Sequence, residues 1–136
     1  MRLEDRIQHA EKGNKTAQFN LGLSYKTGDG VSKDLNEATK WLTKSAEQGL
    51  VNAQSALGSL YLENGKTPQD YDKAVMWYSR AAEQGYVDAF VMLAHTYSIG
   101  EKVPQDYKKA FRWYNKAAEQ GDSEACFNLG DMFAKG

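Results

Sequence analysis

Apolar residues recur along the chain in two alternating helical patterns. In the first, Ala17, Leu21 and Tyr25 follow one another at intervals of four residues, so they share one stripe of a helix. The second pattern places five small or apolar residues at the spacing i, i+3, i+4, i+7, i+8, which also defines one helical face: Ala38, Trp41, Leu42, Ser45 and Ala46. Turn-forming residues such as Gly28, Asp29 and Gly30 separate the two, so the sequence predicts pairs of amphipathic helices.

Both patterns repeat with a period of 36 residues, which is the strongest signal in the sequence. The period is followed by four glycines, which we expect to end each second helix in a left-handed conformation, and by all three tryptophans: Gly13, Gly49, Gly85 and Gly121, with Trp41, Trp77 and Trp113. The repeat predicts one domain over 1–136 in five parts. They are a capping half-repeat with a polar outer face, three complete repeats and a C-terminal half-repeat: 1–13, 14–49, 50–85, 86–121 and 122–136.

Polar residues at the predicted helix starts fit the same scheme. We expect three aspartates to cap the second helices and two residues to cap first helices: Asp34, Asp70 and Asp106, with Asn14 and Asp122. Gly22, Gly58 and Gly130 fall within first helices, where glycine is unfavourable unless another helix packs closely against it. A single hairpin cannot bury its apolar stripe, so neighbouring hairpins must share a core.

The repeated motif resembles the Sel-one-like repeat, a relative of the tetratricopeptide repeat. In the first repeat it comprises thirteen positions: Ala17, Leu21, Gly22, Tyr25, Gly28, Asp34, Ala38, Trp41, Lys44, Ala46, Glu47, Gln48 and Gly49. The resemblance implies an all-α, right-handed α/α superhelical solenoid of helix-turn-helix repeats, and a non-catalytic adaptor that assembles protein complexes. One cysteine-rich branch of the family is linked with penicillin binding. This chain lacks its paired cysteines, so a hydrolase of that type is a remote alternative.

Composition and charge narrow the possible partners. The chain has 136 residues, 41% of them apolar, with 17 Lys and Arg against 18 Asp and Glu, so nucleic acid is a poor partner. Without a long apolar run or a signal peptide, we expect a cytoplasmic protein with no membrane contact. Cys126 is alone, and no motif for catalysis, a cofactor or a metal ion is present.

Residues that vary between repeats are the candidates for partner binding. In tetratricopeptide-like solenoids, a stripe of the first helices lines the concave groove, and here it contains both apolar and acidic residues. We therefore expect a partner peptide or helix with apolar anchors and some basic residues. The alternative that Phe19, Val91 and Phe127 merely pack between helices stays open. The predicted binding residues are Phe19, Leu23, Lys26, Asn52, Ser55, Ser59, Leu62, Glu63, Asp88, Val91, His95, Ile99, Phe127 and Asp131.

Three further expectations concern charged residues and the chain end. His95 is expected to be an ordinary surface histidine, and the cations of the second helices to lie on solvated faces away from the tryptophans. A basic cluster leaves an acidic partner possible: Lys102, Lys108, Lys109, Arg112 and Lys116. The last first-type helix carries Leu129, Met132 and Phe133 with no second helix after it, which predicts self-association there. A structural spacer that acts by end-to-end stacking is the second hypothesis.

Overall fold

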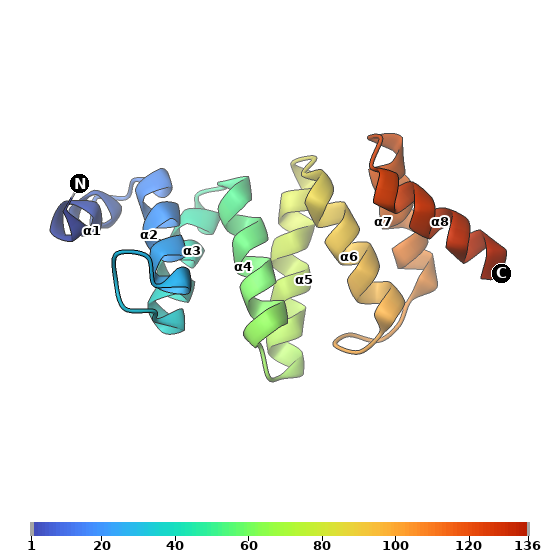
Figure 1. The fold of residues 1–136 in the computed structure, drawn as a ribbon, viewed down its shortest axis with the longest axis horizontal. Coiled ribbons are helices and arrows are strands. Elements are labelled where there is room, and N and C mark those ends of the chain that lie inside the picture. The colour runs from blue at the N-terminus through green and yellow to red at the C-terminus, as the bar shows by residue number, and fades with distance from the viewer. Residues whose placement is uncertain (1, 136) are drawn as a thin grey trace. The chain divides into compact units, whose positions relative to one another are not determined.

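The computed structural model describes residues 2–135, except for the side chains of Phe133 and Lys135. Within these residues every regular element is a helix and no strand occurs, which confirms the all-α prediction. The helices run in the order α1 Leu3–Glu11, α2 Lys15–Thr27, α3 Leu35–Glu47, α4 Val51–Asn64, α5 Pro68–Glu83, α6 Val87–Ile99, α7 Tyr107–Glu119 and α8 Ser123–Lys135 (Figure 1). The chain divides into two compact units, Met1–Leu60 and Tyr61–Gly136.

The core of the first unit forms where α2 packs against α1 and α3. Ala10 of α1, Leu21 of α2 and Trp41 of α3 are buried together, with Ala17 and Tyr25 packed against them. Each of these residues belongs to one of the repeating patterns. The two apolar stripes therefore meet in one core, as the sequence predicts.

In the second unit α6 packs against both α5 and α7, and α7 packs against α8. Its core consists mostly of small and aromatic residues at the repeating positions: Ala74, Trp77, Tyr78, Ala81, Ala89, Leu93, Ala110, Tyr114 and Ala117. Phe90 and Trp113 stack with their ring centroids 5.8 Å apart, which fixes α6 against α7. Trp113 itself is half-buried, whereas Trp41 and Trp77 are buried.

Each second helix ends in the same hydrogen-bonded corner. At the end of α3, Gly49 has a φ of +89°, and its N–H donates to the Ala46 carbonyl at 2.9 Å. The Leu50 N–H donates to the Ser45 carbonyl at 3.4 Å, which completes a Schellman motif. The corresponding bonds form at the other three glycines of the period, Gly13, Gly85 and Gly121. The left-handed glycines predicted from the repeat are confirmed.

Glutamines reinforce the corners of the first unit. Buried Gln18 donates to the Ala10 carbonyl at 3.0 Å, and buried Gln54 donates to the Ala46 carbonyl at 3.2 Å. Gln48, from the motif that ends each second helix, donates to the Gly13 carbonyl at 2.9 Å. These bonds satisfy carbonyls at helix ends that would otherwise lack a partner.

A buried serine explains one departure from the repeating motif. Ser45 occupies a position where the later repeats have alanine, and its side chain is fully buried. Its hydroxyl donates to the Lys15 carbonyl at 2.7 Å, in the first turn of α2. The serine thus joins α3 to α2 by a hydrogen bond, so its burial is compatible with its polarity.

The predicted N-caps are confirmed except at Asp70. The side chains of Asp34 and Asp106 cap α3 and α7, and those of Asn14 and Asp122 accept from the first turns of α2 and α8. The prediction for Asp70 is wrong, because α5 starts at Pro68 with Thr67 as its N-cap.

Asp70 is instead the third residue of α5 and completes a capping box with Thr67. Its carboxylate accepts from the Lys66 N–H at 3.1 Å and from the Thr67 N–H at 3.4 Å. The hydrogen bond from the Lys66 N–H is the main reason that the pKa of Asp70 lies below its usual value. The threonine before the proline allows α5 to start earlier than the aspartate pattern suggests.

Gly22 shows the close helix approach that its position predicts, but Gly130 does not. A Cβ atom added to Gly22 would lie 2.8 Å from Leu42 Cγ and 3.2 Å from the Leu42 backbone nitrogen. A Cβ atom added to Gly130, the same position of the repeat in α8, would have no heavy atom within 4 Å. The expected close packing is therefore confirmed at Gly22, while the matching face of α8 is open.

We expect the same substitution at these two glycines to have opposite effects. Gly22→Ala should lower the free energy of unfolding by about 1 kcal/mol, because overpacking of about 1–3 kcal/mol outweighs a gain in helix propensity of about 1 kcal/mol. Gly130→Ala should raise it by about 0.5–1 kcal/mol, because only the propensity changes. Urea denaturation of both variants measures the difference, and a change of the same sign in both would contradict the packing described at Gly22.

Candidate functional site

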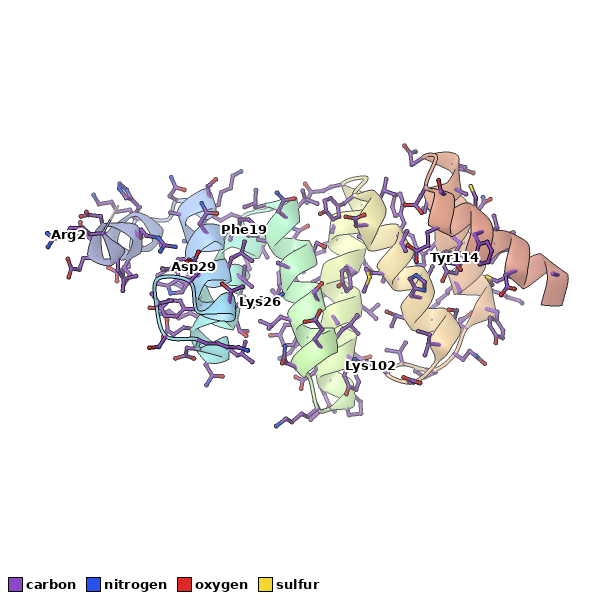
Figure 2. The ribbon with its side chains drawn as sticks, viewed as in Figure 1. Arg2, Phe19, Lys26, Asp29, Lys102 and Tyr114 are labelled. Carbon is purple, nitrogen blue, oxygen red and sulfur yellow. The ribbon has the colours of Figure 1, made fainter. Side chains whose placement is uncertain are left out.

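In the first unit the predicted binding residues lie on α2 and α4 and form no enclosed cavity of their own among the described residues. Phe19, Leu23 and Lys26 are half-buried along α2, where Phe19 and Lys26 are labelled in Figure 2. On α4, Asn52 is exposed, whereas Ser55 and Ser59 are half-buried. These positions thus offer a partly covered surface with one cation.

In the second unit the predicted residues fall into two groups. Leu62 and Val91 are buried, with 7% and 8% of their surface exposed, so their side chains belong to the core. For Val91, the alternative of packing between helices therefore describes its surroundings. The exposed group comprises three acidic residues and two large apolar ones, of which Ile99 is 57% and Phe127 76% exposed: Glu63, Asp88, Asp131, Ile99 and Phe127.

His95 is the centre of a hydrogen-bonded chain that connects three helices. Its Nε2 atom lies 2.9 Å from Glu124 Oε1 on α8, and its Nδ1 atom lies 2.9 Å from the hydroxyl of Tyr114 on α7. A carboxylate can only accept, so in a neutral imidazole Nε2 donates to Glu124 and Nδ1 accepts from Tyr114. The expectation of an ordinary surface histidine is wrong, because the side chain bonds α6 to both α7 and α8.

Tyr114 is buried at the inner end of this chain, and its place on α7 is labelled in Figure 2. Burial raises the pKa of Tyr114 above its usual value, since the phenolate would lose its hydration. A hydrogen bond with the Ser98 side chain opposes this shift, and the negative charge of Glu124 adds to it. The fold therefore favours the neutral phenol, which can donate to His95.

Several cations predicted to face solvent instead cover aromatic rings. Lys40 and Lys44 lie 4.8 and 5.7 Å from the ring centroid of Trp41, and Arg80 lies 4.7 Å from that of Trp77. The expectation that such cations lie away from the tryptophans is wrong for these three residues. Their aliphatic stems shield ring surface while their charges face the π-electrons, which is favourable at the rim of a core.

The basic cluster of the third repeat is divided by the same interaction. Three of its lysines lie over aromatic rings, at 5.0–5.6 Å from the centroids of Tyr71, Tyr97 and Trp113: Lys102, Lys109 and Lys116. Lys102, labelled in Figure 2, also donates to the Leu62 carbonyl at the end of α4. The two other cations, Lys108 and Arg112, line a surface groove.

This groove, which we call the α7–α8 groove, has a volume of about 1050 Å³. It is lined by one residue of α6, six of α7 and three of α8: Ser98, Tyr107, Lys108, Phe111, Arg112, Tyr114, Asn115, Asn128, Asp131 and Met132. Tyr107 is 58% exposed and Phe111 38% exposed, so aromatic surface is accessible in its wall. The groove thus combines apolar surface with two cations and one carboxylate.

Only Asp131 of the predicted binding residues lines this groove. The other lining residues were missed because the prediction followed the first helices, whereas most of the wall comes from the second-type helix α7. The available signal was the exposed terminal patch expected around Met132, which the structure places in the groove wall. Phe133, also expected in that patch, has a side chain outside the described part.

One polar atom of the groove wall lacks a partner. The Asn128 Nδ2 atom is inaccessible to solvent and makes no hydrogen bond. The neighbouring Asn115 Nδ2 atom, in contrast, donates to Glu119 at 3.1 Å. An unpaired buried amide is unfavourable, so the wall beside Asn128 is incompletely satisfied as it stands.

Other site types find little support in the described chain. Among residues 2–135 no three His, Cys, Asp or Glu side chains gather where they could hold a metal ion. None of the helices described is both long enough and apolar enough to cross a membrane. Cys126 is a free, exposed thiol.

Comparison with known proteins identifies the repeat. Four consecutive stretches match the family model described as the Sel1 repeat: residues 15–50, 51–86, 88–122 and 123–136. No curated protein matches the chain significantly.

Solved structures are similar over nearly the whole chain. The protective antigen c5321 of uropathogenic Escherichia coli, which displays an SLR fold, is 36% identical with a TM-score of 0.84, and the match covers 96% of this chain. This chain spans only 28% of the length of that antigen chain. A Sel1 repeat protein from Oxalobacter formigenes is 38% identical with a TM-score of 0.73, and the match covers 95% of this chain and 97% of that one. Helicobacter pylori cysteine rich protein B is 27% identical with a TM-score of 0.67, at coverages of 93% and 94%.

We expect Tyr114→Phe to lower the free energy of unfolding near neutral pH by about 1 kcal/mol, because His95 loses a hydrogen-bond partner. The pKa of Tyr114 is raised in the folded state, so its contribution is present below the unfolded pKa of about 10 and is lost as the pH rises through the folded value. The variant should therefore lose less stability than the wild type above about pH 10.

Urea denaturation at a series of pH values measures this difference. Tyr107→Phe is the matched control, because Tyr107 is 58% exposed and its phenol can ionise in water in both states. An alkaline loss in Tyr114→Phe as steep as in the wild type would contradict the assigned role of Tyr114.

Proposed function

We propose, since this chain belongs to the Sel1 repeat family, that it is a non-catalytic interaction module that binds a peptide or helix of a partner protein. The family and its solved relatives suggest a repeat module for protein interaction. The observation that carries the proposal is the exposure of Phe127 and Ile99, 76% and 57%, on the faces of α8 and α6 that vary between repeats. A large apolar side chain this exposed contributes little to the core, so partner binding is a reason for its presence.

The variable faces of α6 and α8 lie side by side in the second unit. His95 of α6 and Glu124 of α8 belong to these faces, and their side chains are 2.9 Å apart. The two helices can thus offer one continuous surface, which supports a partner segment that contacts both.

The charge of this surface indicates the chemistry of the partner. Asp88 is exposed at the start of α6, and Glu124 and Asp131 are exposed on α8. Apolar side chains bordered by carboxylates favour a segment with apolar anchors and basic residues, because opposite charges direct the encounter and fix the register. Lysine and arginine of the partner would pair with these carboxylates.

A catalytic role for the Tyr114–His95–Glu124 chain has little support. The order hydroxyl, imidazole, carboxylate is that of a nucleophilic triad. Tyr114 is only 2% exposed, however, so its hydroxyl cannot approach a substrate, and His95 is already bonded on both sides. The hydrolase alternative therefore has no accessible nucleophile in this chain of residues.

Two other expectations from the sequence remain predictions. A spacer that acts by stacking through residues 122–136 is the alternative to an adaptor, and it would make self-association the main activity. The cytoplasmic location also rests on the sequence alone.

The double variant Ile99→Ala/Phe127→Ala tests the proposed surface. Both side chains are exposed, so the fold should persist while the capture of a partner from a lysate of the source cells falls at least about tenfold. Met76→Ala is the matched control, because Met76 is also a large, 39% exposed apolar residue but lies on α5. Quantitative mass spectrometry of the captured proteins gives the ratio, and circular dichroism verifies folding.

Equal capture by the wild type and the double variant would show that the faces of α6 and α8 do not bind. Loss of the partner with Met76→Ala as well would point to a different surface. If the wild type captures nothing and sediments as an oligomer, the spacer hypothesis replaces the adaptor.

A further inference from the structure

The paired helices within each unit show how a second-type helix binds a first-type helix. In the first unit α3 packs along α2, and Leu42 of α3 fills the space that Gly22 leaves open. In the second unit α7 packs along α6, with Trp113 stacked on Phe90. The structure thus contains two examples of one interface.

On α8 the same interface is open. Gly130 occupies the position of Gly22, and an added Cβ atom would meet nothing within 4 Å. Met132, two residues further along α8, lines the α7–α8 groove. The groove therefore lies beside the face that α2 and α6 cover with a second-type helix.

The other wall of the groove supports the same occupant. Phe111 of α7 stands at the repeat position of Val75 in α5. Val75 lines a small cavity together with Asp106 and Lys109 of the following second-type helix, α7, so in α5 this position lies against a neighbouring helix. Phe111 has no following helix and is 38% exposed.

We propose that the α7–α8 groove binds an amphipathic helix of a partner protein, in the place of a second-type helix. The helix would insert an apolar side chain at Gly130, as Leu42 does at Gly22, and cover Phe111 and Met132. This surface differs from the exposed faces of α6 and α8, so the proposal goes beyond the proposed function.

Charge identifies the partner helix further. Asp72 of α5 lines the same small cavity as Lys109 of α7, so a carboxylate and a cation occupy that corner. In the groove, the position of Asp72 is taken by Lys108, and Arg112 lies one turn further along α7. The charge of the corner is reversed, so the partner should carry an acidic residue where α7 carries Lys109.

The N-terminal helix of a second copy does not fit this description. In α1, polar residues occupy the positions where α3 has its buried face: Arg2, Asp5, Arg6 and His9 in place of Ala38, Trp41, Leu42 and Ser45. Arg6 already donates to Ser24, and Ala10 is buried in the core of the first unit. The free face of α1 is therefore too polar to cover Phe111.

The chain itself supplies a suitable probe. A labelled peptide of residues 34–50 has the sequence of α3 and carries Glu37 at the repeat position of Lys109. We expect this peptide to bind the full chain in fluorescence anisotropy at low salt, and the Glu37→Lys peptide to bind at least about fivefold more weakly. Lys108→Glu in the chain should reverse that preference.

Gly130→Leu tests the position of the bound helix. The leucine would occupy the point of close approach and should weaken peptide binding at least about tenfold, while the fold is retained because Gly130 is exposed and leucine favours helix. Ala134→Leu is the matched control, because Ala134 is exposed on the same helix outside the groove. Ile99→Ala/Phe127→Ala should bind the peptide normally, so this proposal and the proposed function can fail separately.

Three results would overturn the proposal: no binding at several hundred micromolar peptide, equal binding to Gly130→Leu and Ala134→Leu, or an unchanged charge preference in Lys108→Glu. Analytical ultracentrifugation supplies a further check. A dimer that Gly130→Leu dissociates, without peptide binding to the wild type, would assign the groove to a second copy instead.

Discussion

The left-handed glycine at the end of each second helix is the constraint on which the helical pairs depend. A Schellman corner at Gly13, Gly49, Gly85 and Gly121 fixes the direction in which the next first helix starts, because its hydrogen bonds leave the chain little freedom. The apolar stripes can meet in a core only if this direction is constant. Buried Gln18 and Gln54 add a side-chain bond to the same carbonyls, so two corners are held by both backbone and side chain.

The fold could be predicted from the sequence because its main interactions repeat. The core positions of Leu21 and Trp41 follow from spacing along single helices, and the left-handed glycines follow from the period. The error at Asp70 arose where a local alternative competed: Thr67 before Pro68 provides a better start for α5. Periodicity averages over repeats, so it cannot reveal a start that only one repeat possesses.

The candidate sites were less predictable, because their interactions do not repeat. His95 varies between repeats, which makes it a candidate for partner binding, yet it bonds residues 19 and 29 positions away that no other repeat supplies. Lysines over tryptophans were also missed, because a flexible cation next to a ring in sequence can point to solvent or fold back. A variable residue in a repeat protein can therefore serve the fold of its own repeat and cannot be assigned to binding by variation alone.

Repeat proteins gain much of their stability from interfaces between neighbours, which has a consequence at any exposed face of the repeat. The residues that complete an interior interface are the same ones that form an unpaired surface where no neighbour follows, as the contrast between Gly22 and Gly130 shows. Such a surface already has the shape for a helix. Because its charged residues are not needed to pair with an internal neighbour, Lys108 and Arg112 are free to select among helices by charge. The array thus provides the binding geometry, and substitutions at a few positions of one repeat are sufficient to provide the specificity.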